Sequence, residues 1–164
     1  MKVLVLGATG LIGTAVTKEL LQTGHEVTGL CRTERSAAHL ERLGATPLRG
    51  DLEDPAPWAG VVATIDGIIQ TAATFEDDMG SVDWCVLAAL MQAAETAGSR
   101  PRFIYTGGCW LYGETGDVVA SEESPFNPLP GVVRPKRTGL SLSGFRRFRR
   151  QVAAILPARF AGSP

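Results

Sequence analysis

The chain has 164 residues, of which 45% are hydrophobic and 20% are charged, and this composition is that of an ordinary globular protein. It contains no run of about 18 apolar residues, the length that a membrane span needs, and its start has no signal-peptide layout. Its three cysteines, Cys31, Cys85 and Cys109, are far apart and form no zinc-binding or disulfide pattern. We therefore expect a cytoplasmic protein with reduced thiols, no metal site and no membrane span.

The net charge of −1 hides a sharp division of charge along the chain. Residues 1–123 hold all 17 acidic residues and 8 of the 16 basic ones, whereas residues 124–164 hold the other 8 basic residues and no acid. Four prolines between residues 124 and 140 disfavour regular structure there. We expect a domain over residues 1–130 and a divergent basic tail over residues 131–164, in which residues 144–156 can form one amphipathic helix.

The arginine run at residues 146–150 in this tail is typical of a solvated basic helix. Binding to an anionic membrane or to nucleic acid is the alternative, and nucleic acid is not the partner that we expect. The abrupt change in charge motivates the hypothesis that the tail is a replaced terminus or the product of a translated frameshift.

Strand and helix patterns alternate along residues 2–105. The aliphatic run at residues 2–6 ends in glycine and is typical of a strand buried on both faces of a parallel sheet. Further strands are predicted at residues 25–31, 46–49, 67–70 and 102–105, and helices at residues 10–23, 36–43, 54–62 and 77–97. This alternation predicts an α/β fold of Rossmann type, a doubly wound parallel sheet in three α/β/α layers.

Three glycines follow the first strand directly and open the first helix. Gly7 permits a tight turn, Gly10 lets phosphates approach the backbone, and Gly13 lets the helix pack closely on the sheet. The amide groups at the start of the helix then face a pyrophosphate, which the helix dipole also favours. These amides belong to Thr9, Gly10, Leu11 and Ile12. The loop predicts a dinucleotide site, and the alternative is a turn that merely needs glycines.

The segment Gly-Ala-Thr-Gly-Leu-Ile-Gly at residues 7–13 resembles the loop of the extended and atypical short-chain dehydrogenase/reductases, the NAD-dependent epimerase/dehydratase family. Residues 50–52 are similar to the family's adenine-contacting segment, residues 71–73 to the segment beside the adenosine ribose, and residues 103–113 to its fifth strand and closing Tyr-Gly. The resemblance implies cofactor contacts from Asp51, Leu52, Thr71, Ala72 and Ala73. It also implies hydride exchange between a nicotinamide cofactor and a small carbonyl, alcohol or sugar-nucleotide substrate.

Charged residues after the second strand bear on the choice of cofactor. An acid there binds the ribose 2′-hydroxyl of NAD, and an arginine accommodates the 2′-phosphate of NADP. Arg32 and Arg35 favour NADP, whereas Glu34 leaves NAD open, and all three are also typical of solvated charges at a helix start. Asp51 has its own alternative, since an aspartate there can simply cap a turn. We expect NADP.

The residues that would use the cofactor are incomplete. The resemblance implies a Tyr-x-x-x-Lys pair and a Ser or Thr, in which the lysine helps the tyrosine to transfer protons. Aligning Tyr112 with the family's closing Tyr-Gly places Gly108 at the Ser or Thr position, and neither Tyr105 nor Tyr112 has a lysine four residues on. Thr106 and Tyr112 are the remaining candidates for catalysis.

Two functions therefore stay open. The first is an oxidoreductase or epimerase that uses other groups, in a chain that is truncated or has a divergent C-terminus. The second is a non-catalytic NADP-binding module with a regulatory or redox-sensing role, which Gly108 and the missing tyrosine of the Tyr-x-x-x-Lys pair favour. The predicted helix at residues 77–97 corresponds to one that often pairs subunits in the family, so we expect a homodimer; a helix that only covers the sheet is the alternative.

Overall fold

The structure is a computed structural model that describes residues 1–73, 79–106, 112–121, 123–125 and 127. The chain forms two compact units, Met1–Ile104 and Tyr105–Pro164. None of the helices in the described ranges is both long and apolar enough to cross a membrane. The predicted tail at residues 131–164, with its helix at residues 144–156, lies outside the described residues.

A parallel sheet of five strands is the centre of the fold. The strands are β1 (Lys2–Leu6), β2 (Glu26–Cys31), β3 (Thr46–Arg49), β4 (Gly67–Gln70) and β5 (Arg102–Tyr105). Their order in the sheet is β3-β2-β1-β4-β5, so β1 lies in the middle, with Val3 opposite Val27 of β2 and Gly67 of β4. All of β1 after Lys2 is buried, as its aliphatic sequence predicts.

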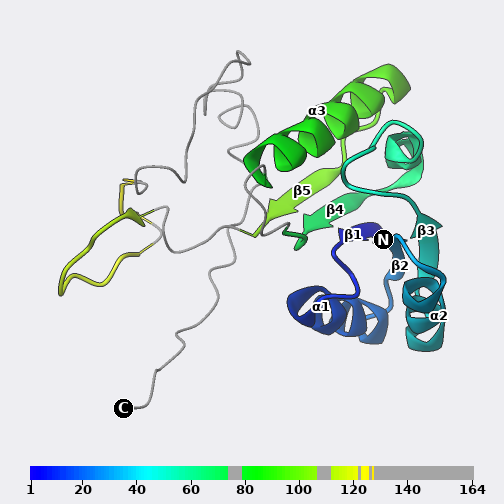
Figure 1. Cartoon of the computed structure of the whole chain (residues 1–164), viewed down its shortest axis with the longest axis horizontal. Helices are drawn as coiled ribbons and strands as arrows, with labels where there is room; N and C mark the ends of the chain where they lie inside the picture. Colours follow the sequence, from blue (N-terminus) through cyan, green and yellow to red (C-terminus); the bar gives the residue numbers. More distant parts are fainter. Residues whose placement is uncertain (74–78, 107–111, 122, 126, 128–164) are drawn as a thin grey trace. The chain divides into compact units, whose positions relative to one another are not determined.

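Helices cover both faces of this sheet. Figure 1 shows α1 (Leu11–Gln22) and α2 (Glu34–Leu43) on one face, and α3 (Met79–Ala97) on the other. The 3₁₀ helix η1 (Ala59–Thr64) packs against α3. The predicted doubly wound Rossmann-type architecture in three layers is therefore confirmed.

One predicted element is wrong. Residues 54–62 form no α-helix; they form turns that lead into η1, which begins only at Ala59. Pro57 has no amide hydrogen for a helical hydrogen bond, and its ring disfavours helical geometry in the residue before it. The amides of Trp58 and Ala59 instead both donate to the carbonyl oxygen of Pro55, at 3.2 and 2.9 Å.

Capping residues explain where α2 begins and ends. The Thr33 side chain accepts a hydrogen bond from the Ser36 amide at 3.2 Å, so the helix begins at Glu34, two residues before the prediction. At the other end, Gly44 adopts the left-handed conformation with φ of 91°, as is common after a helix. The cap at Thr33 places the first turn of α2 directly after the end of β2.

Candidate dinucleotide-binding site

The glycine loop lies at the carboxyl edge of the sheet, where the connections from β1 and β4 diverge. The chain leaves β1 towards α1 on one face, and it leaves β4 towards α3 on the other (Figure 1). In open parallel sheets, such a divergence forms the crevice in which ligands bind. The sheet order thus places the glycine loop and residues 71–73 on the two sides of one switch point.

The loop itself is a tight turn that leads directly into α1. Gly7 has a φ of 78°, a conformation that side chains other than glycine disfavour, and its carbonyl oxygen accepts the Gly10 amide at 2.9 Å. The Gly10 carbonyl oxygen in turn accepts the Thr14 amide at 2.8 Å. Leu11, the first residue of the helix, is 89% exposed. The outer side of the helix start is therefore accessible to a ligand.

The three glycines face different surroundings. A Cβ atom on Gly7 would lie 2.6 Å from the Ala72 nitrogen, and one on Gly13 would collide with the Gly7 carbonyl group. Among the described residues, a Cβ atom on Gly10 would meet only the Gly7 oxygen, at 3.3 Å. Gly7 and Gly13 are thus required by close packing within the protein. Gly10 instead leaves open space on the side where we expect the pyrophosphate.

Residues 70–72 are held by hydrogen bonds to the end of β1 and to α3. The amide and the hydroxyl of Thr71 both donate to the Leu6 carbonyl oxygen, at 3.0 and 2.7 Å. The Gln70 side chain is 2% exposed; its Oε1 accepts the Ala72 amide at 3.1 Å, and its Nε2 donates to Asp83 Oδ1 of α3 at 2.8 Å. These bonds fix the backbone that would pass beside the adenosine ribose.

The sequence interpretation did not identify Gln70 and Asp83. The signal was a polar residue that ends the buried apolar run of β4, directly before a segment assigned to the cofactor. A buried polar side chain needs hydrogen-bond partners, so its presence at that point predicts a structural bond of some kind. The partner on α3 is 13 residues away and follows only from the fold.

Asp51 caps a turn after β3. Its Oδ1 accepts the Glu53 amide at 3.1 Å, and its Oδ2 lies 3.9 Å from Nη1 of Arg32. Its main-chain oxygen accepts a hydrogen bond from the buried indole of Trp58 at 2.7 Å. The turn-capping geometry is thus present, and Leu52 follows it as a half-buried residue. The position beside the β2 end remains compatible with an adenine contact, which stays a prediction.

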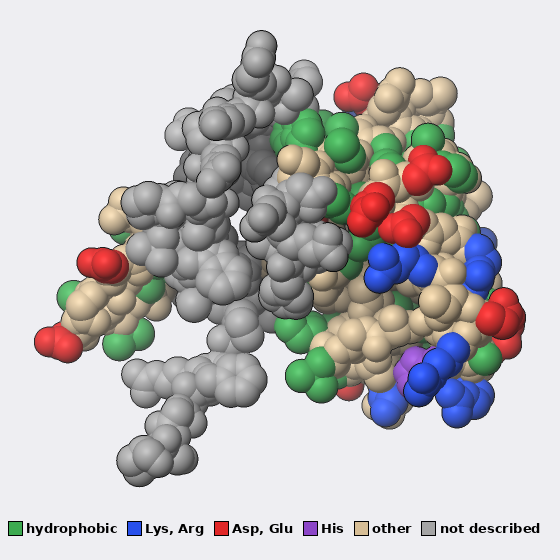
Figure 2. All heavy atoms as spheres, viewed as in Figure 1, with side chains coloured by type: hydrophobic (Ala, Val, Ile, Leu, Met, Phe, Trp, Pro, Cys, Tyr) green, Lys and Arg blue, Asp and Glu red, His purple; other side chains and the backbone are tan. Residues whose placement is uncertain are grey.

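A basic cavity adjoins the glycine loop. It has a volume of about 280 Å³ and is lined by Thr9, Arg35, Ser36, His39 and Arg42. Figure 2 shows lysine and arginine side chains gathered around a histidine over the α2 region. In the described part of the chain, no acidic group forms an ion pair with Arg35 or Arg42.

Of the charged residues predicted to read the cofactor, only Arg35 lines this cavity. Arg32 faces Asp51, and Glu34 faces Arg49 with 3.7 Å between Nη1 and Oε2. The sequence interpretation missed Ser36, His39 and Arg42. Positions 35, 39 and 42 have the spacing of one helix face, but the predicted helix began at residue 36 and so left Arg35 outside it.

Cys31, at the end of β2, is a buried thiol beside this region. Burial raises its pKa, and the nearby Arg49 guanidinium offsets only part of the effect. Its Sγ donates to the Leu48 carbonyl oxygen at 3.6 Å. The group is therefore a protonated packing residue at neutral pH rather than a nucleophile.

The two catalytic candidates, Thr106 and Tyr112, belong to the second unit. Thr106 is half-buried, and its Oγ1 has no hydrogen-bond partner among the described residues. Tyr112 is half-buried too, and Gly108 lies outside the described residues. Their roles in catalysis remain predictions.

Comparisons with known proteins define the class of this protein. The sequence matches the NAD dependent epimerase/dehydratase family over residues 3–139, so the chain belongs to that family. Among solved structures it is similar to a UDP-glucose-4-epimerase from Stenotrophomonas maltophila with bound NAD and formylated UDP-arabinopyranose. The TM-score is 0.66 at 22% identity, over 80% of this chain and 44% of that one. This likeness shows the fold.

Curated relatives lie closer in sequence. An uncharacterized protein of Saccharomyces cerevisiae is 36% identical over 149 residues, which cover 87% of this chain and 49% of the relative. A photosystem II assembly factor of Synechocystis is 32% identical over 108 residues, or 64% of this chain and 33% of that protein. The chain thus spans half or less of the length of these relatives. The family, which is described as NAD dependent, supports a nicotinamide cofactor.

Proposed function

We propose that the chain binds NADP at the glycine loop, as part of an oxidoreductase or epimerase that exchanges hydride between the nicotinamide and a small carbonyl, alcohol or sugar-nucleotide substrate. The family match and the loop geometry support the nicotinamide cofactor. The single observation that carries the choice of NADP is the basic cavity beside Thr9.

The cavity has the donors that a 2′-phosphate needs. Arg35 and Arg42 supply two guanidinium groups, and Ser36 supplies a hydroxyl. A phosphate monoester carries a charge of about −1.5 to −2 near neutral pH, and charge-assisted hydrogen bonds to it contribute about 1.5–3 kcal/mol each. Since Thr9 belongs to the glycine loop, the cavity continues directly from the expected pyrophosphate position. The paired Glu34 supports the same choice, because it is engaged by Arg49.

A non-catalytic NADP-binding module is the second candidate. The observation that favours it is the absence, in this sequence, of a lysine four residues after Tyr105 or Tyr112. The similar Synechocystis protein carries a name that refers to assembly rather than to a reaction. In that case the glycine loop binds the same cofactor, and the cofactor-bound protein has a regulatory or redox-sensing role without catalysing a reaction.

We also propose a cytoplasmic location and the pairing of two copies of the chain through α3.

Calorimetric titration with NADPH and NADH tests the cofactor. In the double variant Arg35→Gln/Arg42→Gln, NADPH binding should weaken by about tenfold to a hundredfold while NADH binding stays unchanged. Lys18→Gln is the matched control, because that lysine is exposed and does not line the cavity. Equal affinity of the native chain for both cofactors would refute NADP selectivity.

Turnover distinguishes the two candidate functions. The native chain is incubated with NADPH and a panel of aldehydes, ketones and sugar nucleotides, and NADPH oxidation is followed by absorbance. Turnover supports the enzyme, and substitution of Thr106 and Tyr112 then tests their roles. Tight NADPH binding without turnover on any of the panel supports the module.

A further inference from the structure

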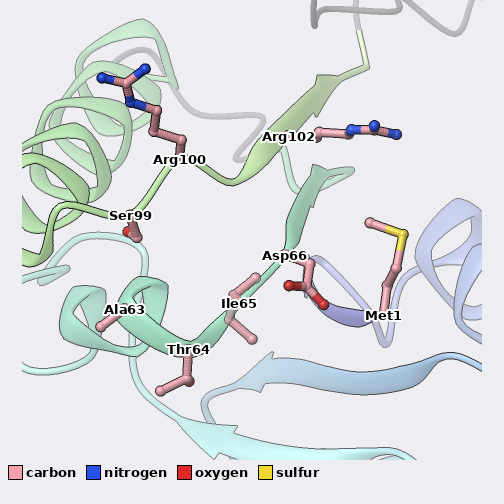
Figure 3. A pocket seen from close by; sticks show the side chains of 8 residues that line it. All are labelled: Met1, Ala63, Thr64, Ile65, Asp66, Ser99, Arg100 and Arg102. Atoms are coloured by element: carbon pink, nitrogen blue, oxygen red, sulfur yellow. The ribbon is translucent and has the colours of Figure 1, made fainter.

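A second cavity lies at the opposite edge of the sheet from the glycine loop. It has a volume of about 590 Å³, within the range of small-molecule sites, and lies at the amino ends of β1, β4 and β5. Figure 3 shows Asp66 and Met1 on one side of it and Ser99, Ala63 and Thr64 on the other. Every lining residue belongs to the first unit.

Two arginines give this cavity its charge. Arg100 and Arg102 are exposed, and neither forms an ion pair with an acidic group in the described ranges. Asp66 is the acid in the lining, and its Oδ2 already accepts the Lys2 amide at 2.7 Å. The Arg102 amide donates to the Asp66 carbonyl oxygen at 2.9 Å, and this bond fixes the backbone of Arg102 at the start of β5. The cavity therefore has an excess of positive charge on a rigid base.

Ser99 supplies a second and independent observation. Its Oγ is buried, and it has no hydrogen-bond partner in the part of the chain that the structure describes. Its amide is used for another purpose, since it donates to the Ala94 carbonyl oxygen at 3.0 Å and closes the end of α3. Buried hydroxyl groups normally have a partner. Ser99 also lines the cavity, so a rotation of its side chain would let a ligand oxygen there supply one.

We propose that this cavity binds the phosphate group of a small phosphorylated metabolite. A phosphate has enough oxygens to accept bonds from both guanidinium groups and from the Ser99 hydroxyl at once, and arginine forks match its geometry. In Figure 3 the side chains of Arg100 and Arg102 extend in different directions, and both have flexible stems that allow them to turn towards an anion between them. The volume beyond the phosphate accommodates the rest of the metabolite.

This site is independent of the proposed function. The cofactor would lie at the carboxyl edge of the sheet, whereas the arginine cavity lies at the amino edge, with the length of the strands between them. The two cavities share no lining residue. If NADP does not bind at the loop, the proposal for the arginine cavity is therefore unaffected. If phosphate does not bind in the arginine cavity, the proposal for NADP is likewise unaffected.

The experiment must separate the two basic cavities, because inorganic phosphate can bind to either. The full chain with Arg35→Gln/Arg42→Gln serves as the background, in which the cavity beside the loop has lost its arginines. Binding of inorganic phosphate, glucose 6-phosphate and glucose is then measured by amide chemical shifts at constant ionic strength. Saturable binding of both phosphate compounds but not of glucose is expected, with shifts of the Ser99, Arg100 and Arg102 amides.

Variants of the arginine cavity then test the assignment. Arg100→Gln/Arg102→Gln should weaken binding of both phosphate compounds by about tenfold or more, whereas Arg49→Gln, an exposed arginine outside both cavities, should leave it unchanged. Ser99→Ala keeps the main-chain bond at the end of α3 and should weaken binding several-fold. Unfolding temperatures show whether the Arg100→Gln/Arg102→Gln variant folds. If it does not, the phosphate affinity of Ser99→Ala tests the assignment alone.

Four results would overturn the proposal. The first is phosphate binding that disappears in the Arg35→Gln/Arg42→Gln background, which assigns all of it to the cavity beside the loop. The second is equal binding by the Arg100→Gln/Arg102→Gln variant and its parent. The third is a linear, unsaturable response to phosphate. Binding of glucose 6-phosphate without inorganic phosphate assigns the recognition to the sugar and equally contradicts the proposal.

Discussion

Replacing Gly10 and Gly13 by alanine, one at a time, should separate ligand binding from folding. The Gly13 methyl group would collide with the Gly7 carbonyl group, and it would also lie 2.8 Å from the Thr71 hydroxyl. In the described part of the chain, the Gly10 methyl group would meet only the Gly7 oxygen, at 3.3 Å. We therefore expect Gly13→Ala to destabilise the protein and Gly10→Ala to weaken cofactor binding without comparable loss of stability.

The magnitudes follow from these contacts. Overpacking of a closed contact costs about 1–3 kcal/mol, which corresponds to a fall of roughly 2–12 °C in Tm for a chain of this length. Gly10 has φ of −76° and ψ of 174°, which alanine adopts without strain, so its replacement should change stability by less than about 1 kcal/mol. A methyl group that keeps the pyrophosphate from the backbone should weaken NADPH binding by about tenfold or more, or 1.4 kcal/mol per factor of ten.

Thermal unfolding and calorimetric titration with NADPH measure the two effects on the same preparations. Gly60→Ala is a suitable control, because a Cβ atom at that exposed glycine meets nothing within 4 Å. Two results would refute the reasoning. One is NADPH binding by Gly10→Ala that equals that of the native chain, and the other is an unfolding temperature of Gly10→Ala as low as that of Gly13→Ala.

Two further predictions follow from the surroundings of the loop. Gln70→Leu removes the acceptor of the Ala72 amide and the donor to Asp83, so it should cost about 1–3 kcal/mol of stability and weaken NADPH binding. The control is Gln92→Leu, at an exposed position of α3. Unchanged NADPH binding by Gln70→Leu would contradict the role of Gln70 in positioning residues 71–73. Because burial keeps the pKa of Cys31 above its ordinary value of 9.0, its thiolate fraction is small at pH 8. In a Cys109→Ser background, iodoacetamide should therefore modify the exposed Cys85 well before Cys31, and equal rates would show that Cys31 is accessible and ionised.

Most of the fold could be predicted because its signals are local. The buried run of β1 and the three glycines after it are contiguous in sequence, and their spacing is set by backbone geometry alone. The 3₁₀ helix η1 could not be predicted from apolar spacing, because Pro57 blocks an α-helix that the spacing alone favours. By contrast, α2 begins two residues earlier than its apolar spacing predicts, because the Thr33 side chain accepts a hydrogen bond from the Ser36 amide and caps the helix.

The candidate site was less predictable, because its side chains interact across the fold. Arg32 and Arg35 are nearly adjacent in sequence, yet one faces Asp51 and the other lines the basic cavity. That division depends on the turn after β3, which the Trp58 indole holds through the Asp51 carbonyl oxygen. The sequence can therefore indicate that two arginines follow β2, whereas which of them lines the basic cavity depends on the fold of the turn after β3.

The glycine loop is supported mainly through main-chain atoms, and this determines which substitutions it tolerates. The Leu6 oxygen accepts two bonds from Thr71, and the Gly7 oxygen accepts the Gly10 amide, so the loop shape depends little on loop side chains. Side chains contribute as well: the Thr71 hydroxyl makes one of the two bonds to Leu6, and Thr14 Oγ1 donates to the Ala8 carbonyl oxygen at 3.2 Å. The buried Gln70 side chain joins the Ala72 amide to Asp83 in α3. Asp83 lies on α3, on the sheet face opposite α1, and contacts the buried side-chain amide of Gln70. A substitution of Asp83 should therefore change the position of Ala72, which bonds to the same amide. Substitutions on α3 should therefore affect cofactor binding at this position more than at the exposed Cys85, although both lie on the same helix.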